Sequence, residues 1–146
     1  ASAAELCALL SAISDIPIKQ NFSVTGSVNQ YGEIQAIGGV NEKLEGFYDI
    51  CNARVLTGNQ AVIIPRSNIK HLMLKPEIVE SVKKGSFSIY GVKSVDEGLS
   101  ILTGIKAGEK NKKGNFPKDS INGMVVARLQ KLSKTIKEFQ HPKKNS

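Results

Sequence analysis

The hydrophobic positions along the chain predict alternating helices and strands. Residues 3–14 are apolar on nearly every side, which predicts a buried helix. That helix ends before Pro17, because the residue before a proline avoids the α conformation. Residues 22–28 alternate apolar and polar side chains, as in a half-buried strand. A turn at residues 29–32 and a short strand at residues 33–37 complete a predicted hairpin.

A second helix is predicted to begin after Gly38-Gly39. Its apolar residues share one helical face and are Val40, Leu44, Phe47, Tyr48 and Cys51. The rest of the pattern gives short strands at 61–65 and 86–90 and helices at 76–84 and 95–102. Such alternation predicts an α+β (α/β-like) domain, with helices packed on short mixed sheets.

The end of the chain differs from the rest in charge. Residues 106–146 contain 11 basic and three acidic side chains, a net charge of +8, whereas residues 1–105 contain nine and 10, a net charge of −1. The basic character of the chain therefore belongs to the C-terminal segment. We divide the segment into a polar basic loop, 105–118, and a basic helix and tail, 119–146. In the helix, Asp119 is the predicted cap of an amphipathic stretch that runs to Phe139. A solvated surface explains these charges better than a DNA-binding patch, although DNA remains a possible partner of the segment.

Composition limits the class of protein. The 146 residues suit one domain, and 40% hydrophobic with 23% charged residues is typical of a soluble globular protein. No apolar stretch is long enough to cross a membrane. Cys7 and Cys51 have neither zinc-site spacing nor the density of a disulfide scaffold, so we expect no metal and a reducing, cytoplasmic location.

Two residues could carry chemistry. Ser2 precedes the first helix, where it is either a helix cap or a nucleophile at the positive end of the helix dipole. Lys43 lies at the edge of an apolar face, so it is either a surface lysine with a covered stem or a partly desolvated, neutral amine. Helix geometry alone favours the structural alternative for Lys43. The two histidines, His71 and His141, lie in turn-like and tail segments, which makes a Ser-His-Asp triad a poor fit.

Several segments, in the right order, resemble Lon-type ATP-dependent proteases. Ser2-Ala3-Ala4-Glu5-Leu6 resembles the nucleophile segment of that family. Thr25-Gly26, followed by the run from Gly32 to Leu44, resembles the segment that carries its catalytic lysine. Val62-Ile63-Ile64-Pro65 and Asn68 also match. The resemblance covers residues 1–104 and implies a Lon protease-domain-like fold with a C-terminal helical extension.

The resemblance also implies roles and partners. It makes Ser2 the nucleophile, Lys43 the general base and Thr25 a residue that supports the lysine by hydrogen bonding. The chain has no GxxxxGK[ST] phosphate loop, so we expect no cofactor here and ATP use by an ATPase module elsewhere in the same protein. The implied assembly is a homo-oligomeric ring, a hexamer, that acts on protein or peptide substrates.

Two departures from the family pattern accompany this resemblance. The family has strands upstream of the serine, which are expected to precede Ala1, and Ser27 stands where an acidic residue is common. The main hypothesis is a serine endopeptidase with a Ser-Lys dyad, the proteolytic part of an ATP-dependent protease that degrades unfolded or regulatory proteins. The alternative is a catalytically silent, ring-forming interaction module with a nucleic-acid-binding basic tail. An N-terminal-nucleophile hydrolase is set aside, because Ala1 occupies the first position.

Overall fold

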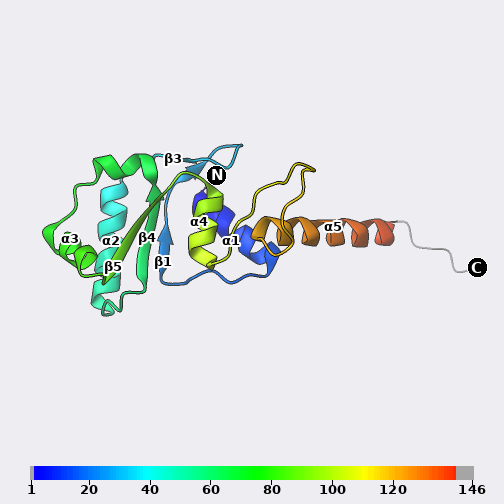
Figure 1. The fold of residues 1–146 in the computed structure, drawn as a ribbon. Helices are drawn as coiled ribbons and strands as arrows, with labels where there is room; N and C mark the ends of the chain where they lie inside the picture. Colours follow the sequence, from blue (N-terminus) through cyan, green and yellow to red (C-terminus); the bar gives the residue numbers. More distant parts are fainter. Residues whose placement is uncertain (1, 141–146) are drawn as a thin grey trace, which may run out of the picture.

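The fold contains two small sheets, of which the larger lies at the centre of the molecule (Figure 1). The computed structural model describes residues 2–140. The larger sheet has three parallel strands in the order β1-β4-β5 (Figure 1): β1 (Phe22–Val24), β4 (Gln60–Pro65) and β5 (Phe87–Val92). The smaller sheet is an antiparallel pair, β2 (Ser27–Val28) and β3 (Ile34–Gln35). The predicted α+β class with helices on short mixed sheets is therefore confirmed.

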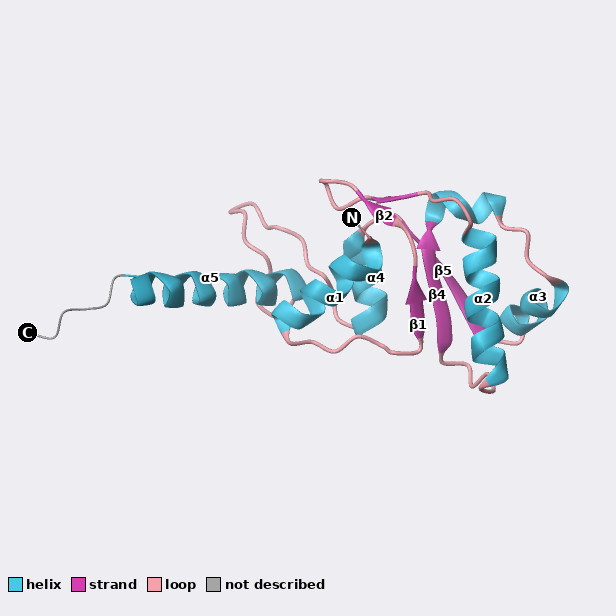
Figure 2. Ribbon diagram, turned by 180° about the vertical axis from the view of Figure 1, so that it is seen from behind, coloured by secondary structure: helices cyan, strands magenta, loops and turns pink. Residues whose placement is uncertain are grey.

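The central strand β4 is buried on both faces, as expected for a parallel sheet covered by helices on either side. Val62 and Ile64 pack with one pair of helices, whereas Ile63 packs in the opposite core with the other pair. Figure 2 shows these two helical layers on either side of the strands. The first pair is α2 (Val40–Ala53) and α3 (Pro76–Lys83); the second is α1 (Ala3–Ser14) and α4 (Val95–Thr103).

Two further helical segments complete the fold. A short 3₁₀ helix, η1 (Arg66–His71), follows β4 directly. The last helix, α5 (Ile121–Gln140), begins in the core, where Ile121 and Val125 are buried beside α1 and α4. Every residue of α5 after Val125 is exposed, and the last turns of the helix extend away from the body of the molecule (Figure 1). None of the helices in the described range is both long and apolar enough to cross a membrane.

Most predicted elements are confirmed, but the stretch 22–28 is not one strand. It breaks at Thr25-Gly26 into β1 and β2, which belong to different sheets. The break occurs at Gly26, whose φ of +139° is incompatible with a continuous strand. Apolar and polar side chains continue to alternate across the break, so the sequence pattern did not indicate a turn there.

Two expectations about helices are also wrong in detail. The first helix is not buried all round: α1 has Ala3 and Cys7 in the core, but Leu9 is 55% exposed, because only one side of α1 faces the sheet and its neighbouring helices. The final helix is confirmed, but its cap is Ser120 rather than Asp119. Ser120 Oγ accepts from the N–H of Gly123 at 3.1 Å.

Candidate active site

Ser2 caps α1, as one of the two sequence interpretations predicts. Its backbone is extended, with φ −81° and ψ 136°, and its Oγ accepts a hydrogen bond from the N–H of Glu5 at 3.4 Å. A hydroxyl that only accepts in this bond retains its own proton, which a base can remove. Ser2 also lies at the positive end of the α1 dipole, where developing negative charge is stabilised. Capping and nucleophilic attack are therefore compatible roles for this residue.

The loop between β1 and β2 holds the start of α1 in place. The N–H of Ala3 donates to Gly26 O at 3.0 Å, and Ser2 forms an isolated antiparallel bridge with Ser27. At Gly26, the φ of +139° suits glycine, and a Cβ atom would lie 2.8 Å from Cγ2 of Ile34. Glycine at this position thus allows the loop to pass close to β3 while it contacts the residue next to Ser2.

Thr25 directly follows β1 and lies at the edge of the larger sheet. Its N–H donates to Ile63 O at 3.0 Å, which prolongs the pairing of β1 with β4. Its side chain lines the same surface hollow as Ser2 and Lys43. Within residues 2–140, no hydrogen bond joins the Thr25 hydroxyl to Lys43, so its supporting role stays a prediction.

Lys43 lies in the first turn of α2, where its N–H donates to Gly39 O at 3.1 Å. Val40 and Leu44, which precede and follow Lys43 in this helix, are buried, but the Lys43 side chain itself is exposed. Helix geometry alone favours a surface lysine over a partly desolvated amine, and the exposed side chain agrees with that interpretation. The physical reason is its position: the edge of the apolar face opens onto a hollow, and none of the described segments covers it.

Asn68 fixes the segment that leads into α2. Its buried side chain makes two hydrogen bonds to the backbone of Ile37: the Ile37 N–H donates to Oδ1 at 3.1 Å, and Nδ2 donates to Ile37 O at 3.0 Å. Ile37 is followed by Gly38-Gly39, where α2 begins. The family resemblance included Asn68, but the sequence did not predict these hydrogen bonds to Ile37. The signal that could have indicated them is a polar residue soon after a buried strand.

The hollow joins the three residues that the resemblance singles out. Ser2 from the start of α1, Thr25 from the end of β1 and Lys43 from α2 line one open hollow of about 500 Å³, which we call the Ser2 hollow. One carboxylate, that of Glu42, also lines it. The remaining walls are largely apolar and include Val24, Ile37, Phe47, Ile50 and Val62. The hollow therefore offers a hydroxyl, an amine and an apolar surface for a substrate side chain.

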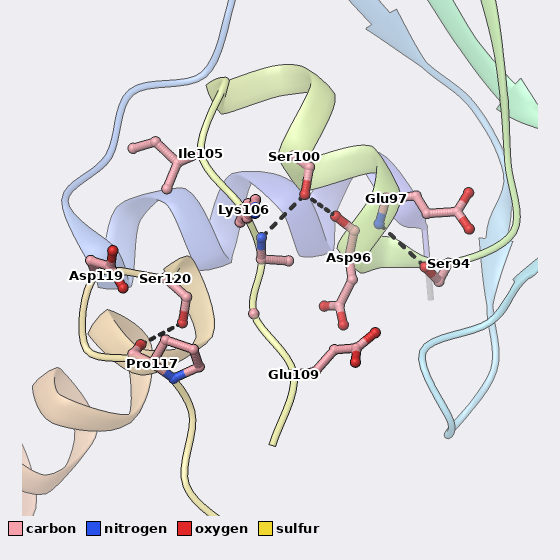
Figure 3. Close-up of a pocket in the computed structure, with 12 residues that line it drawn as sticks. Ser94, Asp96, Glu97, Ser100, Ile105, Lys106, Glu109, Pro117, Asp119 and Ser120 are labelled. Atoms are coloured by element: carbon pink, nitrogen blue, oxygen red, sulfur yellow. Dashed lines mark hydrogen bonds between the residues drawn. The ribbon is translucent and has the colours of Figure 1, made fainter. Parts of the chain in front are cut away.

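A second, larger hollow of about 790 Å³ lies between α4, the loop after it and the start of α5 (Figure 3). We call it the Ser94 hollow. Its serines serve local structure: Ser94 Oγ caps α4 by accepting from the Glu97 N–H at 3.2 Å, and Ser120 Oγ donates to Pro117 O at 2.6 Å. Ser100 Oγ likewise donates within its own helix.

The Ser94 hollow is rich in carboxylates. Its one lysine, Lys106, shares the hollow with those of Asp96, Glu97, Glu109 and Asp119. Although this hollow is larger, we take the Ser2 hollow as the candidate site, because it contains the serine and the lysine that the family resemblance singles out.

Other reactive groups do not form a competing site. Cys7 lies on the buried side of α1. Burial raises the pKa of its thiol to about 11, which disfavours the nucleophilic thiolate. Burial also raises the pKa of Cys51. His71 is exposed at the end of η1, and His141 lies outside the described residues. Within the described range, His, Cys, Asp and Glu side chains form no group of three that could hold a metal ion.

Comparisons with known proteins identify the family of this chain. The family model of the Lon protease (S16) C-terminal proteolytic domain matches residues 1–104. The chain is 36% identical over 101 residues to an archaeal Lon protease of Thermococcus kodakarensis, a match that covers 69% of this chain and 14% of that protein.

Two bacterial relatives differ in how much of the chain they match. The "Putative Lon protease homolog" of Escherichia coli is 52% identical over 102 residues, 70% of this chain and 17% of its own length. The protein of the same name from Haemophilus influenzae is 37% identical over 142 residues, 97% of this chain and 24% of its own length. The second match thus includes the basic C-terminal segment, although the chain spans a quarter or less of either relative. The chain belongs to the Lon protease family, and residues 1–104 match the proteolytic domain of that family.

Proposed function

We propose that the chain is the proteolytic part of an ATP-dependent protease, a serine endopeptidase with a Ser-Lys dyad. The observation that carries this proposal is that Ser2 and Lys43, which come from different helices, line the same hollow in a Lon-family chain. In the proposed reaction, neutral Lys43 removes the proton of Ser2 Oγ as this oxygen attacks the peptide carbonyl. The backbone at the start of α1 stabilises the oxyanion.

The later steps use the same two residues. Protonated Lys43 returns its proton to the nitrogen of the leaving amine when the peptide bond breaks, which leaves an ester between Ser2 and the acyl group. Lys43 then takes a proton from water as the water attacks this ester, and Ser2 regains its hydroxyl proton when the ester breaks. Thr25 is proposed to orient the lysine by accepting a hydrogen bond from its Nζ.

The exposed position of Lys43 suggests how substrate contributes to the reaction. A lysine becomes a base more readily when water is removed from around it. A peptide whose apolar side chain covers Phe47 and Ile50 would exclude water from this hollow, and catalysis would thus be coupled to substrate binding. The proposed substrates are unfolded or regulatory proteins, which expose such side chains.

The remaining parts of the proposal rest on family membership. We propose that an ATPase module elsewhere in the same protein uses ATP and delivers unfolded substrate, that the proteolytic domains form a homo-hexameric ring, and that the protein acts in the cytoplasm. The described residues contribute the peptidase chemistry to this assembly.

The test compares four alanine variants of the full-length protein in peptide hydrolysis with ATP. Ser2→Ala and Lys43→Ala should each reduce the rate at least ~1,000-fold, because a dyad has no second base. Ser94→Ala and Lys106→Ala, from the Ser94 hollow, are the matched controls and should stay within about twofold of wild type. Ser94→Ala also removes a helix cap, as Ser2→Ala does, at a similar cost of ~1 kcal/mol in the free energy of unfolding. Near-normal activity of either Ser2→Ala or Lys43→Ala would reject the dyad.

A second function is favoured by a separate observation. The exposed part of α5 carries Arg128, Lys131, Lys134 and Lys137, which together could contact DNA phosphates. In the alternative function, the domain is catalytically silent and serves ring assembly and DNA binding. DNA affinity would then fall steeply with salt concentration, and Ser2→Ala would change neither activity nor binding. Hydrolysis that depends on Ser2 excludes the silent module.

A further inference from the structure

We propose that the outer part of α5 pairs in an antiparallel orientation with the same segment of a second copy of this chain, which belongs to another ring because neighbours in one cyclic ring share no two-fold axis. We call this part, Val126–Gln140, the overhang. Its first turn still lies beside the end of α1, its last turns project beyond the body of the molecule (Figure 1), and every residue in it is exposed. Its large apolar side chains are far from covered: Leu132 is 43% exposed and Phe139 is 87% exposed. An isolated helix of this length is only marginally stable in water, so the overhang needs a partner.

The apolar residues of the overhang have the spacing of a coiled-coil seam. They are Leu129, Leu132, Ile136 and Phe139, separated by steps of three, four and three residues. Such steps place side chains at the a and d positions of a heptad, on one narrow stripe of the helix. The stripe spans two heptads, and another helix with the same spacing would complement it.

The space occupied by the body of the molecule limits the orientation of that second helix. The seam continues the face of α5 that Ile121 and Val125 bury against the core. A parallel partner in register would need the space that the body already occupies at these two residues. An antiparallel partner avoids this clash, because its own body then lies beyond Gln140 of the first copy.

The antiparallel arrangement also matches the side chains of the seam. With the two overhangs centred on each other, Leu129 of one copy faces Phe139 of the other, and Leu132 faces Ile136. Each a position thus meets a d position, and all four apolar residues find a partner. The seam is short, at or below the small end of protein interfaces (~1,200 Å²), so the pairing is weak and depends on concentration.

The charges of the helix permit a second copy despite the basic composition of this segment. Lys131, Lys134 and Lys137 fall at positions c, f and b, which point away from a partner helix. Arg128 flanks the seam but faces Thr135 of the second copy. No like charges therefore meet across the seam, and the lysines remain free in the pair. The segment is also shared with a relative, since the Haemophilus influenzae match spans 142 residues.

Sedimentation of the full chain over a range of concentrations tests the pairing. The double variant Leu132→Glu/Ile136→Glu should raise the dissociation constant at least tenfold. The matched control is Lys134→Glu, which changes the net charge by the same two units but at an outward position, and it should change the constant less than twofold. Thermal unfolding followed by circular dichroism should show an intact body in all three proteins, because the overhang contributes no residue to the core. Equal loss in Lys134→Glu, or no loss in the double variant, overturns the proposal.

Disulfide trapping tests the orientation. Leu129→Cys and Phe139→Cys variants, one of them carrying a tag that changes its size, are mixed and oxidised. The antiparallel pair predicts that the disulfide between the two different variants dominates, because these positions face each other. Dominant disulfides between identical variants would indicate a parallel pair and overturn the proposal. Native Cys7 and Cys51 are buried, and oxidised wild-type protein measures their background.

Discussion

The two hollows of this molecule contain the same pair of residue types in opposite surroundings. Each has a serine that caps a helix, Ser2 for α1 and Ser94 for α4, and each has a lysine. The Ser2 hollow has largely apolar remaining walls and one carboxylate, whereas four carboxylates line the Ser94 hollow. A serine and a lysine at one hollow therefore do not identify a site by themselves, because the same pair occurs in walls of different composition.

The hollows also differ in how their residues are brought together. The walls of the Ser94 hollow come from one continuous part of the chain, residues 94–120. The Ser2 hollow joins residues from 2 to 62, and backbone contacts from Gly26 and Asn68 hold its parts in place. Precise placement of distant groups is what a catalytic site requires.

The largest effect is expected from a change that keeps charge but removes basicity. Lys43→Arg should reduce peptide hydrolysis at least ~1,000-fold, because a guanidinium group stays protonated at any pH that the protein tolerates. Lys106→Arg in the Ser94 hollow is the matched control, with an expected change of less than about twofold. Steady-state hydrolysis of a fluorogenic peptide measures both. Substantial activity in Lys43→Arg would mean that Lys43 acts only through its positive charge.

A smaller effect is expected when the support of Ser2 is altered. Gly26→Ala should lower the free energy of unfolding by about 2–3 kcal/mol, because φ is +139° and the new Cβ meets Ile34. Gly38→Ala, where a Cβ meets no atom within 4 Å, should cost less than ~0.5 kcal/mol. Urea denaturation compares the two variants. Equal stability of both would show that the β1–β2 loop is not a rigid support.

The support of Lys43 is expected to give the smallest of these effects. Asn68→Ala removes two hydrogen bonds to Ile37 and should cost about 1–2 kcal/mol in stability. It should also lower the hydrolysis rate about tenfold, since α2 begins close to Ile37 and misplacement by ~1 Å can cost ~100-fold. Asn59→Ala, an exposed asparagine, is the control and should leave both quantities unchanged. A stability loss without any change in rate would separate Asn68 from the site.

Local signals predicted the helices well. The bounds of α1 follow from its apolar residues and Pro17, and α2 begins after Gly39, as its pattern indicates. The break at Gly26 was not predicted, because the alternation of side chains runs through it and only the pairing partners distinguish β1 from β2. The cap of α5 is Ser120, one residue after the predicted Asp119. The exact position of a cap depends on the conformation of the turn before the helix.

The site was predicted less completely than the fold. Family resemblance named Ser2, Thr25 and Lys43, and the structure places all three at one hollow, but their roles stay predictions. Helix geometry placed Lys43 at the edge of an apolar face and favoured a surface lysine, and the side chain is exposed. Which other segments share a hollow with Lys43 depends on distant parts of the chain, and the periodicity of a single helix contains no information about that.

The central claim, that Ser2 is a nucleophile activated by Lys43, is tested most directly by trapping the acyl-enzyme. An apolar β-lactone opens when a serine oxygen attacks its carbonyl, and it leaves an ester on that serine. After brief reaction with the full-length protein, proteolytic digestion and mass spectrometry locate the added mass. We predict that the label lies on Ser2, is absent from Ser94, and is lost in Lys43→Ala. Label on another residue, or equal labelling of Ser2 in Lys43→Ala, would contradict the claim.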